Sequence, residues 1–108
     1  MNVDAETVAL TLIASSGTAR SMAYEALALA KSGDFEQSHN QIEEANKALL
    51  QAHETQTSLL VNEANGNHLP VDVLLVHAQD HLMTSILAVE LIEEIIDLHK
   101  TIKSNTND

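Results

Sequence analysis

The scarcity of helix-breaking residues is what most constrains the fold of this chain. It holds one proline and three glycines among 108 residues. Apart from Gly17, these lie in two short interruptions, at residues 33–34 and 64–70. A β-sandwich or barrel needs many turns and therefore many more such residues, which argues strongly against an all-β fold. Three long segments remain, at about residues 4–32, 34–63 and 71–103, each sufficient for a helix of about 45–50 Å.

Residues at the ends of the first two segments favour the same boundaries. Asn2 or Asp4 can cap the first helix by accepting hydrogen bonds from its unpaired N–H groups. Gly33 suits the left-handed backbone conformation that commonly ends a helix. Asp34 with Gln37 is an aspartate variant of the capping box. The local signals therefore end one helix and begin the next around residue 33.

The third segment should begin between residues 70 and 72, and the polar residues 104–108 should form a frayed tail. Both connections are short, and short connections between long helices force antiparallel neighbours. We therefore predict an all-α fold, an antiparallel up-down-up three-helix bundle. The chain has the length of one domain, so this bundle should span residues 1–108.

The third segment is apolar on more than one face. At helical spacing, one row comprises Leu74, Leu91, Ile95, Leu98 and Ile102, a second comprises Leu75, Leu82, Ile86, Val89 and Ile96, and Val76, Met83 and Leu87 form a third. Such a helix must be covered on more than one side, whereas a three-helix bundle covers mainly one face. We therefore expect partner subunits to pack against this segment. The alternative is an unusually apolar helix in a monomer.

The charge and the absence of cysteine narrow the classes of partner. The net charge is −11 and the cysteine count is zero. Nucleic acids and anionic membranes recruit basic surfaces, so neither is an expected partner. Without cysteine there are no disulfides, catalytic thiols or thiolate metal ligands, which suits the cytosol. No apolar run reaches the roughly 18 residues of a membrane span. We expect a cytoplasmic protein without direct membrane insertion.

Polar residues interrupt the apolar pattern of the third segment. They are His77, Gln79, Asp80 and His81, and the two histidines share one face at i, i+4 spacing. His77 also falls in the heptad row of Leu91, so we expect it to be at least partly buried. Placing such groups there costs desolvation free energy, which favours a functional role over a structural one.

Two chemistries suit this cluster. His77, His81 and Asp80 could supply nitrogen and oxygen ligands to a metal ion. Alternatively, a neutral imidazole could attack phosphorus and form a phosphohistidine. The metalloprotease motif is absent because Ala78 stands where its glutamate would be. A di-iron site is also excluded, since only one Glu-x-x-His motif, at residues 36–39, is present.

Two other features carry weaker signals. The run of small residues at 14–19 lies within the first helix, where Gly17 costs about 1 kcal/mol relative to alanine. Close packing of another backbone is the simpler interpretation, and space for a ligand is the alternative. His53 and Gln56 could reach a cleft from the second helix, although their local pattern favours exposed helix surface.

Four segments together resemble a known family. The sequence VHAQDHLMT at residues 76–84 resembles the signature of the lactose/cellobiose-type IIA proteins of the bacterial phosphoenolpyruvate-dependent sugar phosphotransferase system. GTARS at 17–21, GDF at 33–35 and AHETQT at 52–57 are similar to further patterns of that family. The resemblance extends over about residues 3–103. The motif in the third segment is specific, whereas each of the others alone would be weak.

The resemblance implies a homotrimer of three-helix bundles and a phosphocarrier function. His77 would accept a phosphoryl group from the histidine phosphocarrier protein and pass it to a cysteine of the sugar-specific IIB protein. The sugar would be a β-linked disaccharide such as lactose, cellobiose or chitobiose, and the sequence does not choose among them. Asp80 resembles an axial aspartate that holds a divalent cation, for which Mg²⁺ is our expectation. His81, one turn from His77, could donate a hydrogen bond to the phosphate, whereas Gln79 should point elsewhere.

Two other functions fit the residues. One is a helical trimeric interaction module that binds a transition metal through His77 and His81 without phosphotransfer. The other is a purely structural trimer in which the polar residues fix the register of the subunits. The first predicts tight metal binding, and the second predicts that replacing His77 leaves every activity unchanged.

Overall fold

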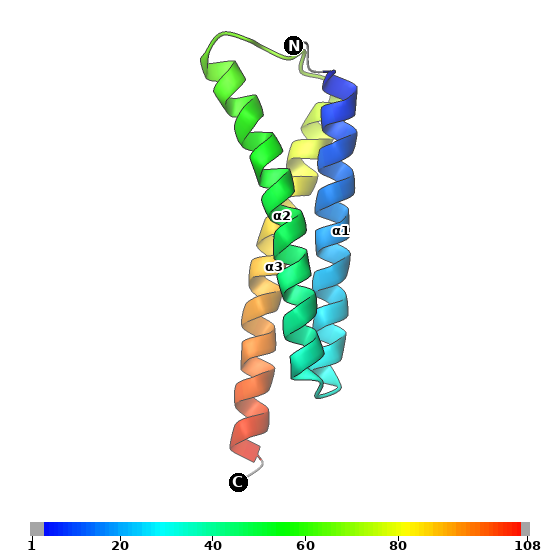
Figure 1. The fold of residues 1–108 in the computed structure, drawn as a ribbon, viewed down its shortest axis with the longest axis vertical. Helices are drawn as coiled ribbons and strands as arrows, with labels where there is room; N and C mark the ends of the chain where they lie inside the picture. The colour runs from blue at the N-terminus through cyan, green and yellow to red at the C-terminus, as the bar shows by residue number, and fades with distance from the viewer. Residues whose placement is uncertain (1–3, 107–108) are drawn as a thin grey trace.

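A computed structural model describes residues 4–106, which form three α-helices and no strands. The helices are α1 (Ala5–Lys31), α2 (Phe35–Ala64) and α3 (Val73–Thr106). They lie side by side in an elongated bundle of 60 × 21 × 20 Å (Figure 1). The prediction of an all-α three-helix bundle is confirmed.

Hydrogen bonds between helices give the direction of each one. Along α2, residues of increasing number contact residues of decreasing number in both neighbours: Ser38 with Ala26 and Gln41 with Glu25 in α1, Asn46 with Glu93 and Gln56 with Gln79 in α3. Helix α2 therefore runs opposite to α1 and α3. The colour gradient in Figure 1 follows the same course, down α1, up α2 and down α3.

The predicted signals at the first three helix ends are confirmed. Asp4 caps α1 by accepting a hydrogen bond from a backbone N–H of the first turn, whereas Asn2 lies outside the described residues. Gly33 has a φ of 91°, the left-handed conformation expected after α1. Asp34 caps α2, and its Oδ1 accepts the N–H of Gln37 at 3.2 Å.

Helix α3 begins as predicted and ends later than predicted. The Oδ1 of Asp72 accepts the N–H of Leu75 at 2.8 Å, which fixes the start within the expected window. The polar tail expected from residue 104 is instead helical through Thr106, and residues 107–108 lie outside the described part. The hydroxyl of Thr106 donates to the carbonyl of Lys103 at 3.1 Å, so a polar side chain helps to satisfy the last turn.

The core is organised around α1, which packs along both other helices, while α2 and α3 contact each other little. The buried seam of α1 has mostly small side chains at spacings of three and four residues: Val8, Ala9, Leu12, Ser16, Ala19, Ala23, Ala26 and Ala30. Small side chains allow other groups to approach closely, and Ser16 and Ala19 of the run at 14–19 are buried in this seam. In Figure 1 the C-terminal half of α2 leans away from the other two helices.

Helix α3 buries one row and exposes another. Buried residues are Leu75, Ala78, Leu82, Ser85, Val89, Ile92 and Ile96. The opposite side carries what we call the outer stripe, which comprises Val76, Asp80, Met83, Leu87, Leu91, Ile95, Leu98 and Ile102. Its seven apolar members are between 41% and 59% exposed. The prediction that this helix is apolar on more than one face is confirmed. No helix within residues 4–106 is long and apolar enough to cross a membrane.

Candidate functional site

His77 and His81 lie on successive turns of α3, and their rings are close to one another. The ring centroids are 5.8 Å apart, and the ring planes meet at 61°. His77 is exposed and His81 is half-buried. The structure therefore brings the two predicted histidines together, with the first accessible to another protein.

The expectation that His77 is partly buried is wrong for the single chain. Helix α1 contacts α3 far more extensively than α2 does, and the buried row of α3 includes Ala78 and Leu82. The heptad row that His77 shares with Leu91 lies outside this contact, and Leu91 is itself 53% exposed. An exposed imidazole retains its solvation, and it is therefore available as a nucleophile.

Helix α1 holds His81 in place. The Oγ of Ser16 lies 2.7 Å from Nδ1 of His81, and Ser16 is fully buried. Gly17 lies against the same ring, because a Cβ at this position would be 3.4 Å from Cε1 of His81. A shallow depression beside the ring is lined by Thr18, Ser21 and other residues of α1. Ser16 is not among the site residues predicted from the sequence, and the run of small residues around it is the only signal for its role.

Burial lowers the pKa of His81 below its ordinary value of 6.5. The positive charge of Arg20 and the charge of His77 lower this pKa further, whereas the carboxylate of Asp80 raises it. These effects favour the neutral form of the His81 ring. A neutral imidazole has one nitrogen that donates and one that accepts a hydrogen bond.

Gln79 and Gln56 form a separate contact between α2 and α3. The amide of Gln56 donates to Oε1 of Gln79 at 2.7 Å and lies 3.6 Å from the sulfur of Met83. Gln79 thus faces α2, as its spacing from His77 predicted. His53 is exposed on α2. Within one chain Gln56 therefore contacts Gln79 rather than either histidine of the pair.

Asp80 lies in the outer stripe, between Val76 and Met83, and its side chain is exposed. Within residues 4–106, no three histidine, aspartate or glutamate side chains are placed to hold a metal ion together. One chain therefore offers a single carboxylate in an otherwise apolar stripe. The predicted ligand set of His77, His81 and Asp80 does not assemble within one chain.

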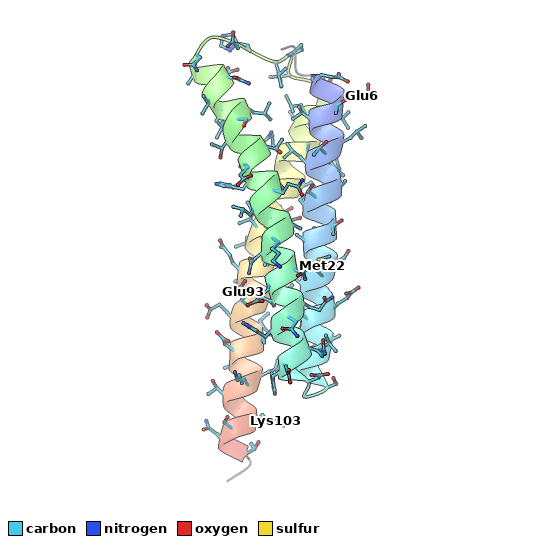
Figure 2. All side chains as sticks on the ribbon, viewed as in Figure 1. Glu6, Met22, Glu93 and Lys103 are labelled. Atoms are coloured by element: carbon cyan, nitrogen blue, oxygen red, sulfur yellow. The ribbon has the colours of Figure 1, made fainter. Side chains whose placement is uncertain are left out.

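Asn46 and Glu93 form a second polar contact between α2 and α3, further from the histidines. The amide of Asn46 donates to Glu93 at 2.7 Å. Figure 2 labels Glu93 where the two helices pass each other. This contact joins the helices near the middle of the bundle without involving either histidine.

Known proteins match this chain over nearly its whole length. The family model described as "PTS system, Lactose/Cellobiose specific IIA subunit" matches residues 7–100. The N,N'-diacetylchitobiose-specific EIIA component of Escherichia coli strain K12 is 48% identical over 99 residues, which cover 92% of this chain and 85% of the relative.

Two solved structures are similar in fold and sequence. The cellobiose-specific enzyme IIA of Bacillus anthracis has a TM-score of 0.91 and 43% identity, covering 96% of this chain and 95% of that one. The IIA(chitobiose) chain in a complex with HPr, from Escherichia coli, has a TM-score of 0.81 and 46% identity, covering 94% and 99%. The chain therefore belongs to the lactose/cellobiose-specific IIA family, and it is a phosphotransferase component of the sugar phosphotransferase system.

Proposed function

We propose that His77 is the phosphorylated residue of this chain and that the protein relays a phosphoryl group between two others. The observation that carries the proposal is the pair of rings on α3. His77 is exposed, and the neutral ring of His81 lies beside it at a centroid distance of 5.8 Å. The test is whether phosphate from the donor becomes covalently bound to His77, measured as a gain in intact mass.

The relay consists of two phosphoryl transfers without water, the first from nitrogen to nitrogen and the second from nitrogen to sulfur. A lone pair on one ring nitrogen of His77 forms the new N–P bond while the N–P bond of the donor's phosphohistidine breaks. The donor ring keeps the bonding electron pair and takes up a proton, which balances the proton lost from the other nitrogen of His77. In the second step a cysteine thiolate of the IIB protein forms an S–P bond while the N–P bond of His77 breaks. The ring of His77 keeps the bonding electron pair and takes up a proton from solvent, which restores the neutral imidazole. Such chemistry depends mainly on positioning and charge neutralisation.

The proposed donor is the histidine phosphocarrier protein, HPr. A chain of the same fold and 46% identity has been solved in complex with HPr. The proposed acceptor is a cysteine of a sugar-specific IIB protein, and the proposed sugar is a β-linked disaccharide of the chitobiose or cellobiose type. The names of the similar proteins support this sugar class. We place the reaction in the cytoplasm.

Association with the donor should slow as salt is added. The chain carries a net charge of −11, so a basic donor surface would be steered toward it. We expect the association rate constant to fall roughly tenfold between low salt and ~0.5 M salt, where charges are screened beyond ~4 Å. Stopped-flow measurements with the phosphorylated donor give this rate. A rate that stays constant across the series would exclude electrostatic steering.

The outer stripe supports assembly into a homotrimer. Seven apolar side chains on one face of α3 are about half-exposed in the single chain. An apolar row of this length is typical of a surface that is buried in an assembly. Three copies of α3 packed along a common axis would cover all three stripes. They would also bring the exposed His77 of each copy beside a neighbouring subunit.

Asp80 is the proposed ligand of a divalent cation in this trimer. A single carboxylate stands in the apolar stripe, so a symmetric trimer would gather three carboxylates. Like charges repel strongly where water is excluded. Carboxylate oxygens are the ligands that Mg²⁺ prefers, so the residue type fits that ion. A bound cation would supply charge neutralisation, and the three Asp80 side chains would hold it.

Asp80→Leu should leave the trimer at least as stable as in the wild type, because it removes repelling charges from an apolar interface. Sedimentation at decreasing concentrations measures the dissociation. Addition of a chelator should weaken the wild-type trimer and leave this variant unchanged. Glu54→Leu, at an exposed position on α2, is the matched control and should keep the wild-type response to the chelator. Dissociation of the Asp80→Leu trimer would contradict the axial placement of Asp80.

A further inference from the structure

Ser16 makes the hydrogen bond by which α1 holds His81 beside the proposed phosphorylation site. Its side chain is fully buried, and its Oγ contacts two groups at short distance. One is Nδ1 of His81, at 2.7 Å, and the other is the carbonyl oxygen of Leu12, at 2.5 Å. The serine therefore links the backbone of α1 to a ring on α3.

The proton count of these three groups fixes the protonation of His81. A carbonyl oxygen can only accept a hydrogen bond, and a serine hydroxyl carries one proton. The proton of Ser16 is therefore directed to the carbonyl of Leu12. Both short contacts are satisfied only when Nδ1 of His81 carries a proton and donates it to Oγ. In the neutral ring, Nε2 then has no proton.

The ring of His81 is also held by the shape of α1. Gly17 follows Ser16 and presents no side chain to the ring, since a Cβ would stand 3.4 Å from Cε1. The His81 ring can therefore lie close to the α1 backbone while Ser16 binds its Nδ1. On its other side it faces the ring of His77, at 5.8 Å between centroids. The buried hydroxyl of Ser16 and the absence of a side chain at Gly17 together set the orientation of His81.

We propose that Ser16 is a positioning residue for phosphoryl transfer, acting through His81. The inference rests on the proposed function of His77. In the unphosphorylated chain the hydroxyl accepts from Nδ1. When His77 carries the phosphoryl group, the hydroxyl turns and donates to Nδ1, and Nε2 carries the proton and donates it to a phosphate oxygen. The proton lost from Nδ1 to solvent is replaced by one taken up at Nε2, so the ring stays neutral.

The rotation of the Ser16 hydroxyl costs little free energy at the carbonyl of Leu12. Its carbonyl accepts the backbone N–H of Ser16 within the helix, as every interior carbonyl of an α-helix accepts from the residue four positions later. It therefore keeps a partner when the hydroxyl turns away. The same buried group can thus serve both states of the site without leaving an unsatisfied oxygen.

Nitrogen-15 NMR of His81 tests the proposal directly, because ring nitrogens with and without a proton have distinct shifts. The wild type should show a protonated Nδ1 and a bare Nε2 before phosphorylation. The proton should move to Nε2 when His77 is phosphorylated. Ser16→Ala should instead show a mixture of the two neutral forms in the unphosphorylated chain. Identical His81 shifts in wild type and Ser16→Ala would overturn the proposal.

The rate of phosphoryl acceptance supplies the second readout. Ser16→Ala should lower the rate at saturating donor by about tenfold, the order expected from imperfect positioning of one group. The KM for the donor should not change, since Ser16 is buried and does not reach the surface. An unchanged rate at saturating donor would overturn the proposal.

Ser38→Ala is the matched control. Ser38 is equally buried, and its hydroxyl donates to the carbonyl of Ala26 at 2.7 Å, ten residues along α1 from Ser16. The Ser38→Ala variant should lose thermal stability as Ser16→Ala does, but it should accept the phosphoryl group at the wild-type rate. A slowed Ser38→Ala protein would assign the effect to general loosening of the bundle.

If wild type takes up no phosphate at all, the proposed function of His77 fails, whereas the NMR measurement on the unphosphorylated chain still decides the role of Ser16.

Discussion

His77→Ala is expected to abolish the flow of phosphate through this chain. The exposed ring of His77 is the proposed nucleophile, and alanine has no group that can form the N–P bond. Phosphorylation of the sugar in a system reconstituted from the donor, this chain, IIB and IIC should fall by at least about 10³-fold, as for loss of other covalent nucleophiles. Formation of the sugar phosphate measures it.

His99→Ala is the matched control for this substitution. His99 also lies on α3, about six turns from His77, and beside the depression at the α1–α2 turn. It should transfer phosphate at the wild-type rate. If the His77→Ala protein still supports sugar phosphorylation, His77 is not the nucleophile, and the polar cluster has a structural role in a trimer.

Leu91→Glu is expected to convert the proposed trimer into monomers. Leu91 is 53% exposed in the single chain and lies in the middle of the outer stripe. A trimer would bury three added carboxylates in an apolar interface, at a cost of several kcal/mol each unless they become protonated. Light scattering should give a mass near 11.7 kDa for this variant and about three times that value for the wild type.

Leu50→Glu separates this effect from a general effect of added charge. Leu50 is 58% exposed on α2, outside the outer stripe. The variant should keep the mass of the wild type. A Leu91→Glu protein that remains trimeric, with its helical circular dichroism intact, would show that another face of the molecule forms the assembly.

The fold was predictable because the residues that begin and end its helices act locally. Gly33 and Asp34 mark the first turn by their own conformational and capping preferences. Asp72, two residues after the only proline, caps α3. Such signals depend on a few adjacent residues. The polar residues from 104 onward predict that the helix ends before them. The hydroxyl of Thr106 instead donates to a carbonyl of the last turn, so α3 continues through this residue.

The site was predictable only in part. His77 and His81 share one helix, so their proximity follows from spacing alone. The exposure of His77 depends on which face of α3 is covered by α1, and the heptad pattern is apolar on both faces. The role of Ser16 depends on a contact with a residue 65 positions away. No local pattern encodes such a contact, and the run of small residues around Ser16 indicates only that something packs closely there.

The most direct test of the account is the intact mass of the wild-type chain after incubation with phosphoenolpyruvate, the first enzyme of the system and the histidine phosphocarrier protein. We predict a gain of one phosphate, about 80 Da, that is lost in acid and that peptide mapping assigns to His77. Omission of the phosphocarrier protein should prevent the gain. A wild-type chain whose mass does not change, or whose phosphate maps to another residue, would contradict the central claim.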